Sequence, residues 1–437
     1  MNTTAPPNHL PWGRTSLVDM PAEDFAILKE KINQAAVDLN AKGYAVIPSL
    51  FTEKECLAFK EMVWDFLEGI GLERDMDYAK MKATQLPPHA HGIMTNYRMN
   101  HAKPFRELRV HPKILAVHSM LNGSSCLTSS LDRVNCKFPG RTYRSKDRWP
   151  HVDQNARNLG LRYVQSYITF NACNEESPQN RFYEGSHLIF EEYFKDRRTS
   201  KTGDAWLRLS LEDRLSVEEE YKCPLVKPNC PAGSMVLWDS RTIHDPDEGT
   251  NFEDGRLVAY HCYTKCFPGM GETFKTKKKN AFSTCRSTPH APYPQTLFPS
   301  SVRTYDKPKG PYDEIPTSKL GYAVSKEGLV MPDEWEKHVF CFKDYDMEHI
   351  GWRIGGSYTI KMINPLEKEW FGEHQVVPKD GKPLLPYTPF SVPPIPYEGK
   401  ASSKKEKKNG GTKSKTPLKR KASSVESKLR VVKKQRK

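Results

Sequence analysis

Three residues of types that bind transition metals stand in two short segments of the chain. One residue separates His151 from Asp153, and His244 follows an apolar run that ends at Trp238. Two imidazoles and one carboxylate can occupy one face of a six-coordinate Fe(II) and leave three positions for other ligands. In a strand, residues two apart point to the same side, so His151 and Asp153 can reach one metal while Val152 turns away. The pattern predicts a mononuclear iron centre.

An arginine extends this constellation. Arg256 follows His244 by twelve residues and stands at the start of a predicted strand. A guanidinium there can hold a carboxylate through two parallel hydrogen bonds. Taken singly, each residue has a plain structural interpretation, the histidines as hydrogen-bonded core groups and Arg256 as a surface ion pair. The prediction therefore depends on the combination.

In their order along the chain, these segments resemble the phytanoyl-CoA dioxygenase-like family of Fe(II)/2-oxoglutarate-dependent dioxygenases. The likeness covers about residues 40–265 and is carried by Gly43-Tyr44-Ala45-Val46-Ile47, His151-Val152-Asp153, Tyr183-Glu184-Gly185-Ser186-His187, the run from Gly233 to His244, and Arg256. The sequence departs from the family pattern at Gln179-Asn180-Arg181 and at Tyr183-Glu184-Gly185. These departures affect the expected substrate loop more than the iron site.

The resemblance implies a double-stranded β-helix, a jelly-roll or cupin-like fold, that binds Fe(II) through His151, Asp153 and His244. It implies 2-oxoglutarate as the cosubstrate, with its distal carboxylate paired to Arg256, and O2 as the oxidant. Decarboxylation of 2-oxoglutarate to succinate and CO2 would accompany hydroxylation of a substrate C–H bond, because Asp153 fills the position that halogenating relatives leave open. Three further residues are expected beside the cosubstrate: Lys137, Gln165 and Tyr167.

Other functions stay open. The chain can be a non-catalytic jelly-roll scaffold or a nucleic-acid-associated structural protein that keeps the ligands for folding. A cupin-like isomerase with another metal is disfavoured because it needs no Arg256. His89 or His91 is a candidate substrate contact, and His187 is expected to support its loop. Three aromatic residues are expected to pack in the core: Trp149, Trp238 and Tyr260.

The elements that must position these residues are mainly β with flanking helices. Apolar residues at helical spacing predict a helix over 25–39, and a strand is expected over 44–48. Thr52 and Glu55 form a capping box that opens a helix to about Leu67. Residues 75–120 are expected to be irregular. Further strands are predicted over 131–138, 163–170, 233–238 and 257–263, with helical material between about 187 and 222.

These elements suggest five regions. Residues 1–20 form a disordered lead, 21–125 a helical N-terminal layer with pocket loops, and 126–266 the double-stranded β-helix core. A Pro-rich extension, 267–400, wraps on the core and carries a helix start at Pro332 and strands near 339–342 and 357–360. Residues 401–437 are a disordered basic tail.

Charge separates the tail from the rest. The tail holds fifteen Lys or Arg and two acidic residues, a net charge of +13 against +14 for the whole chain, so the first 400 residues are near neutral. Such a tail is typical of nuclear localisation signals or of nucleic-acid phosphate binding. We expect a nuclear or cytoplasmic protein with reduced thiols, not secreted and without a membrane span. The substrate stays open among a small molecule, a protein side chain and a nucleobase.

Overall fold

The structure is a computed structural model of the 437-residue chain. Its described residues are 18–20, 22–69, 72–81, 86, 89–90, 92–94, 99–122, 127–141, 148–156, 160–195, 206–251, 253, 255–265, 276, 278–281, 287–288, 290–292, 352–354 and 357–358. The chain divides into two units, residues 1–399 and 400–437. The predicted basic tail, the helix start at Pro332 and the strand near 339–342 all lie outside the described residues.

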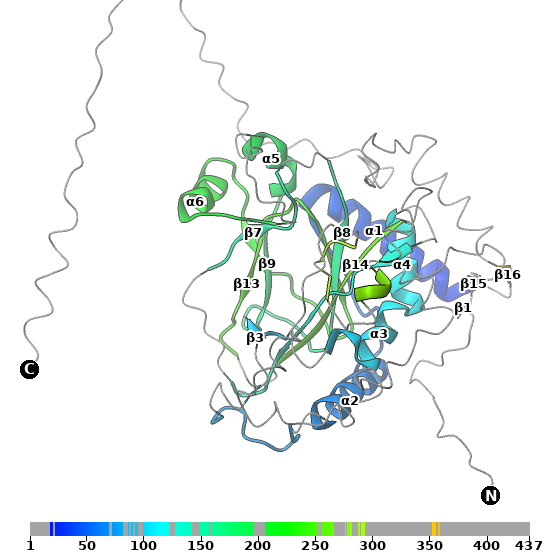
Figure 1. Ribbon diagram of the computed structural model, residues 1–437. Coiled ribbons are helices and arrows are strands. Elements are labelled where there is room, and N and C mark those ends of the chain that lie inside the picture. Colours follow the sequence, from blue (N-terminus) through cyan, green and yellow to red (C-terminus); the bar gives the residue numbers. More distant parts are fainter. Residues whose placement is uncertain are drawn as a thin grey trace, which may run out of the picture. The chain divides into compact units, whose positions relative to one another are not determined.

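Two antiparallel sheets form the centre of the first unit and face each other (Figure 1). The larger has eight strands, in the order β2-β12-β8-β14-β6-β4-β3 with β5 paired to β14. Its strands are β2 (Tyr44–Ile47), β3 (His89–Ala90), β4 (Ile93–Met94), β5 (Leu127–Ser129), β6 (Val134–Lys137), β8 (Val164–Thr169), β12 (Met235–Asp239) and β14 (Arg256–Lys265).

The smaller sheet has five strands in the order β10-β7-β13-β9-β11. They are β7 (His151–Val152), β9 (Gln179–Tyr183), β10 (Leu207–Arg208), β11 (Leu225–Val226) and β13 (His244–Asp247). From β6 to β9, and again from β12 to β14, successive strands alternate between the two sheets. The chain is therefore built mainly of antiparallel sheets, as predicted, with helices on the outside.

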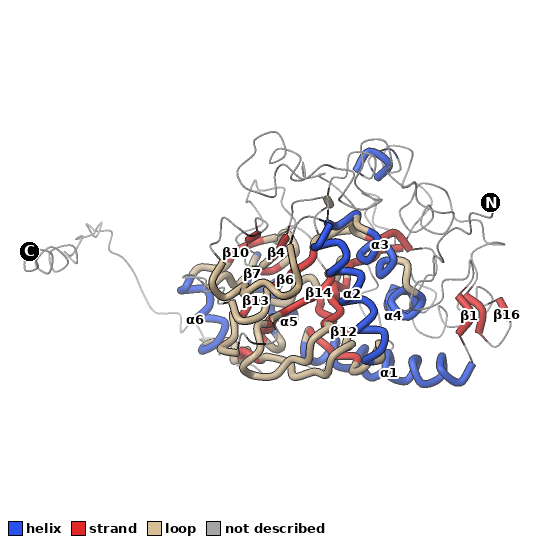
Figure 2. The backbone as a smooth tube through the Cα atoms, turned by 90° about the horizontal axis from the view of Figure 1, so that it is seen from below, coloured by secondary structure: helices blue, strands red, loops and turns tan. Residues whose placement is uncertain are grey.

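Helices cover the outer face of the larger sheet, and two further helices lie at one end of the smaller sheet (Figures 1 and 2). On the larger sheet lie α1 (Ala22–Lys42), α2 (Glu53–Gly69), the 3-10 turn η2 (Met99–His101), α3 (Lys103–Arg109) and α4 (Pro112–Asn122). At the end of the smaller sheet lie α5 (Ser186–Tyr193) and α6 (Leu211–Glu219). One apolar core joins Ile32 of α1 and Phe59 of α2 to Ile168 of β8. A second joins Val152 of β7 to Phe190 of α5.

Strand alternation decides which side chains face the space between the sheets. On β8, Val164 and Ile168 pack in the outer core with the helices. Because side chains alternate along a strand, Gln165 and Tyr167 point the other way, toward the smaller sheet. Tyr167 accordingly packs in a third apolar cluster with Phe182 of β9. The inner face of the larger sheet thus becomes one wall of a site.

Several predicted elements are confirmed. The helices expected near 25–39 and 52–67 are α1 and α2, and the strand expected over 44–48 is β2. The capping box is formed as predicted, because Thr52 N donates to Glu55 Oε2 at 2.7 Å and Glu55 N donates to Thr52 Oγ1 at 3.2 Å. The four strands expected between 131 and 263 are β6, β8, β12 and β14.

Two predictions were wrong. The segment 75–120 is not irregular, because it contains α3 and α4. In α4 the residues Ile114–Asn122 are all buried, so no polar face marks the helical period in the sequence. The lead is not wholly without structure either: Val18–Met20 form β1, which pairs in parallel with β15 (Trp352–Ile354), and β15 pairs with β16 (Ser357–Tyr358).

Part of the predicted extension contacts the core. Thr288 Oγ1 accepts a hydrogen bond from Leu131 N at 2.7 Å, and Lys278 Nζ donates to the carbonyl of Ser129. These contacts place residues beyond 270 beside the strands of the larger sheet. Within the described part of the chain, we find no helix with the length and apolar character of a membrane span.

Candidate metal centre and cavity

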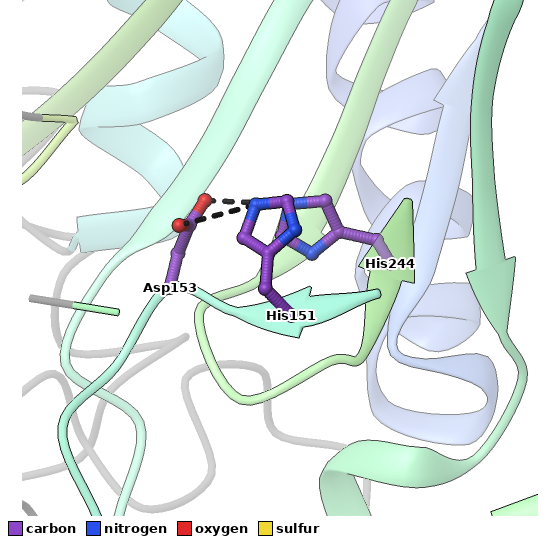
Figure 3. Close-up of side chains that lie close together, drawn as sticks. All are labelled: His151, Asp153 and His244. Atoms are coloured by element: carbon purple, nitrogen blue, oxygen red, sulfur yellow. Dashed lines mark ion pairs between the residues drawn. The ribbon is translucent and has the colours of Figure 1, made fainter. Parts of the chain in front are cut away.

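The three predicted metal ligands lie together between the sheets (Figure 3). His151 opens β7, Asp153 directly follows it, and His244 opens β13, where it stands opposite His151 in the antiparallel pair. His151 Nε2 lies 3.6 Å from Asp153 Oδ1, and His244 Nε2 lies 3.3 Å from Asp153 Oδ2. One ligand atom from each residue falls within 4.8 Å of the others. Val152 points away from the triad, as predicted, into the second apolar core with Phe190 of α5.

Hydrogen bonds to backbone carbonyls fix the tautomer of each imidazole. The Nδ1 of His151 lies 2.8 Å from the carbonyl of Trp149, and the Nδ1 of His244 lies 3.0 Å from that of Thr242. A carbonyl accepts only from an N–H, so each Nδ1 carries the hydrogen and each neutral ring keeps its lone pair on Nε2. Both Nε2 atoms point toward Asp153, which is the orientation that a shared metal requires.

The protonation states also suit a cation. Burial, together with the neighbouring His244, lowers the pKa of His151 to about 4. Burial alone would raise the pKa of Asp153, but His290 and the two ligand imidazoles hold it well below its usual range. Burial opposes protonation of His244, yet Asp153 raises its pKa overall. At neutral pH the site therefore offers a carboxylate and at least one neutral imidazole, and binding a metal displaces any proton from His244.

Two further side chains hold the carboxylate. Gln165 Nε2 donates to Asp153 Oδ2 at 2.8 Å. His290 lies with Nε2 3.1 Å from the backbone carbonyl of Asp153 and Nδ1 3.5 Å from its Oδ1. Gln165 was predicted as a donor to the cosubstrate, and in this structure its amide N–H is engaged by Asp153. The sequence pattern did not indicate His290, which follows the last core strand by 25 residues.

A cavity of about 350 Å³ opens beside the triad. Its lining combines the triad with Gln165, His290 and a group of aromatic side chains: Trp149, Trp206, Trp238 and Tyr260. Three of these, Trp149, Trp238 and Tyr260, were expected to pack in the core rather than to stack on a substrate. Trp238 does pack in the apolar cluster between the sheets, but all three also face the cavity. Trp238 and Tyr260 lie on the inner faces of β12 and β14, and Trp149 stands two residues before His151.

The predicted carboxylate-binding arginine lies behind the cavity wall. Arg256 is buried, and its Nη2 donates at 3.2 Å to Oδ1 of Asn180, a residue that lines the cavity. Its guanidinium stands 5.5 Å from the ring centroid of Tyr167. Lys137 is the cross-strand partner of Arg256 and pairs with Glu248. Burial and the neighbouring guanidinium lower the pKa of Lys137 to about 8.

These basic side chains fit a small dicarboxylate. The Nε of Arg256 and the hydroxyl of Tyr167 are buried donors with no hydrogen-bond partner among the described residues. Leaving such donors unsatisfied costs free energy, so a carboxylate that accepts from them would stabilise the site. The two-His, one-carboxylate set likewise fits Fe(II). Both predicted ligand classes are thus compatible with the residues present.

The remaining predicted residues lie elsewhere. His187 is away from the triad and lies in α5, not in a loop as expected, and its Nε2 is 3.1 Å from the carbonyl of Asn40 near the end of α1. Gly43 lies against the same ring, because a Cβ on Gly43 would stand 2.5 Å from Nδ1 of His187. His91 and the side chain of His89 lie outside the described residues. Among the described residues, the triad is the one cluster of three or more potential ligands that can hold a metal.

No protein-family model matches this sequence. The chain is similar to Ava biosynthesis cluster protein O of Aspergillus versicolor, with 23% identity over 274 residues, which cover 61% of this chain and 88% of that protein.

Three crystal structures are among the solved structures to which this chain is similar. One is the non-heme alpha ketoglutarate dependent carbocyclase SnoK from nogalamycin biosynthesis, with 22% identity, 53% of this chain and 83% of that chain covered, and a TM-score of 0.37. The epimerase SnoN, in complex with Fe3+, alpha ketoglutarate and nogalamycin RO, shows 17% identity, 57% and 93% coverage, and a TM-score of 0.37. EctD from S. alaskensis, with 2-oxoglutarate and 5-hydroxyectoine, shows 15% identity, 53% and 75% coverage, and a TM-score of 0.37. All three TM-scores lie below 0.5, so these similarities do not establish the fold of this chain. The fold follows from the strand pairing of the chain itself.

Proposed function

We propose that this chain is an Fe(II)- and 2-oxoglutarate-dependent oxygenase that hydroxylates its substrate. The observation that carries the proposal is the buried triad of His151, Asp153 and His244, whose ligand atoms converge within 4.8 Å beside a cavity. Two imidazoles and a carboxylate on one face leave open positions on Fe(II), which suits a bidentate cosubstrate and O2. The alternation of strands between two facing sheets supports the predicted double-stranded β-helix as the scaffold.

Bound Fe(II) would let O2 act as the oxidant, with one oxygen atom passing to succinate as 2-oxoglutarate loses CO2 and the other passing to the substrate C–H bond as a hydroxyl group. The residues of the chain bind and orient these groups. Gln165 and His290 fix the Asp153 carboxylate, and the carbonyls of Trp149 and Thr242 orient the two imidazoles. The apolar cluster around Tyr167 excludes water from the space between the sheets, which strengthens every charge interaction there.

Arg256 is the proposed anchor for the distal carboxylate of 2-oxoglutarate. It stands on the inner face of β14, directly opposite Lys137 of β6. The other neighbour of β14 is β8, which carries Tyr167. Its guanidinium is held by Asn180 on one nitrogen and keeps Nε for a further acceptor. Lys137, already paired with Glu248, adds positive charge at the edge of the same region.

A small molecule is the proposed class of substrate. The cavity volume of about 350 Å³ is at the lower end of the range for small-molecule sites. The similar Aspergillus protein is named for a biosynthesis cluster, which also favours a small molecule over a protein or nucleic-acid target.

The proposal is tested by adding Fe(II) and 2-oxoglutarate to the purified protein without O2 and recording the weak visible charge-transfer band of that chelate. We expect a band that is lost in His151→Ala and weakened in Arg256→Ala. His187→Ala is the matched control, since it removes a buried imidazole outside the triad, and it should keep the band. A folded, metal-loaded protein without a band would instead favour the non-catalytic scaffold.

For the basic tail, we propose a role in nuclear import or in phosphate binding on nucleic acid. The support is its net charge of +13 over residues 401–437. If the tail binds nucleic acid, the affinity of the full chain for a mixed-sequence DNA duplex should fall steeply as the salt concentration rises. Deletion of residues 401–437 should then make that affinity depend less on salt. A salt dependence that is unchanged by the deletion would exclude the nucleic-acid role and leave either the import role or a solvated tail with no partner.

A further inference from the structure

We infer that the cavity beside the triad accepts an uncharged, planar aromatic small molecule and that Trp206 selects it by ring stacking. The inference rests on the proposed function, since it names the substrate class of the same site. It comes from the aromatic composition of the cavity, the arrangement of two indoles and the balance of charge in the lining.

Aromatic side chains are concentrated at this cavity. Trp149, Trp206 and Trp238 are three of the eight tryptophans in the chain, and all three line it together with Tyr260. Indole and phenol rings offer large, rigid contact areas that lose little conformational entropy on binding. A lining of this kind favours a flat partner over a flexible polar one.

Two of the indoles form a corner next to a metal ligand. Trp149 stacks on the His151 ring, with centroids 4.5 Å apart and planes 18° apart. Trp206 stands perpendicular to both, at 5.7 Å and 79° from Trp149 and at 6.4 Å and 88° from His151. A planar ring stacked parallel to Trp206 would therefore stand nearly perpendicular to Trp149 and His151, which is the relative orientation of an edge-to-face aromatic pair.

Trp206 retains free surface for this contact. Among the described residues, Trp206 is one of the few large apolar residues that are exposed, with an exposed fraction of 37%. It immediately precedes β10, where Arg208 pairs directly with His151. Because residues two apart share a face, Trp206 lies on the same side of the smaller sheet as the triad. The exposed indole therefore belongs to the wall of the site.

The lining has no excess of charge for a charged substrate. Outside the triad and His290, its charged residues are Asp132 and Arg133, which have opposite sign. Arg256, the strongest cation nearby, lies behind the wall and is assigned to the cosubstrate. A neutral ring system with a hydroxyl or keto group suits this lining better than an acid or an amine.

The test uses two probes that share one carbon skeleton. The probe 2-naphthol is planar and neutral, whereas decahydro-2-naphthol carries the same hydroxyl on a saturated, non-planar skeleton. Binding of each to the full chain, loaded with Fe(II) and 2-oxoglutarate without O2, is measured by calorimetry. We expect 2-naphthol to bind about tenfold more tightly than its saturated counterpart, and Trp206→Ala to abolish most of that preference. Trp206→Phe should keep it, as should the control Trp64→Phe, whose indole packs against Tyr78 and Phe138 instead.

Equal affinity for the two probes, no binding of either, or a preference that survives Trp206→Ala would each overturn the inference. Displacement of 2-naphthol by a short single-stranded DNA would overturn the small-molecule assignment in favour of a nucleobase. The charge-transfer band is recorded on the same samples and should persist in Trp206→Ala. Loss of the band in the wild-type chain marks failure of the proposed function, whereas a normal band without selectivity between the probes marks failure of the inference alone.

Discussion

The amide of Gln165 and the carboxylate of Asp153 join the two sheets at the metal centre. Gln165 lies on β8, in the middle of the larger sheet, with its backbone paired to Trp238 on one side and Cys262 on the other. Asp153 follows β7 of the smaller sheet. The 2.8 Å hydrogen bond from Nε2 to Oδ2 therefore orients a ligand of one sheet from a rigid position on the other. The carboxylate is pre-oriented for metal binding by this contact.

Gln165→Leu should weaken Fe(II) binding by about 10- to 100-fold, the usual cost of losing a partner that orients a metal ligand. Leu has a similar volume and cannot donate to Asp153, so the carboxylate would lose its fixed rotamer. Anaerobic competition against a colorimetric chelator measures the affinity. Gln179→Leu is the control, because Gln179 is also buried but donates to the carbonyl of Asn174, outside the cavity. Equal losses in both variants would indicate a general effect on folding.

Arg256→Lys should weaken 2-oxoglutarate binding by about tenfold or more while Fe(II) affinity stays the same. Lysine keeps the positive charge but lacks the planar pair of donors that grips a carboxylate. Titration of the charge-transfer band with 2-oxoglutarate measures the effect. Arg181→Lys is the matched control. Arg181 also forms a two-pronged pair with a carboxylate, that of Asp245, at 2.9 and 3.0 Å, but it does not line the cavity. If Arg256→Lys binds 2-oxoglutarate as tightly as the wild type, the proposed anchor is wrong.

Strand alternation made much of this site predictable. His151 and Asp153 share a face because they are two residues apart, and β8, β12 and β14 were visible as apolar runs. The same alternation places Lys137, Gln165, Tyr167 and Arg256 on the inner face of the larger sheet. That these residues come together follows from local periodicity combined with the order of the segments.

Other parts left no local signal. β9, with the sequence Gln-Asn-Arg-Phe-Tyr, carries three polar residues in succession, and two of them are buried by contacts from distant segments. α4 lacks a polar face because it is enclosed on all sides. His290 reaches Asp153 from a Pro-rich segment without periodicity, so only the tertiary structure shows its place. Such contacts join residues that are far apart in the sequence, and local residue types and spacing do not show which distant residues will meet.

The turn before β12 is expected to require glycine. Gly233 has φ of +78°, and a Cβ there would stand 2.1 Å from the carbonyl oxygen of Phe51. Gly233→Ala should therefore lower the free energy of unfolding by about 2 kcal/mol or more, from left-handed strain plus a clash with backbone. Gly140→Ala is the control: φ is +70°, but its Cβ would meet only Ala79 Cβ at 3.5 Å. Urea denaturation should show a clearly smaller loss for Gly140→Ala, and similar losses would argue against the clash.

Buried histidines should make the fold sensitive to mild acid, and His118 offers a test away from the metal. Burial lowers its pKa to about 3, and its Nε2 lies 2.9 Å from Ser166 Oγ. The unfolded chain takes up a proton on this residue below about pH 6.5, whereas the folded chain excludes it until about pH 3. Its contribution to stability is therefore complete above pH 6.5 and is lost as the pH falls.

His118→Gln keeps a hydrogen-bonding side chain that does not titrate. Between pH 6.5 and 5 its free energy of unfolding should fall less than that of the wild type, by up to about 2 kcal/mol, since one group contributes at most about 1.4 kcal/mol per pH unit. Urea denaturation of both proteins at several pH values measures the difference. His151 and His187, whose pKa values are also lowered, titrate equally in both proteins, so they do not contribute to a difference between the two slopes. Parallel slopes would show that the folded chain accommodates a charged His118.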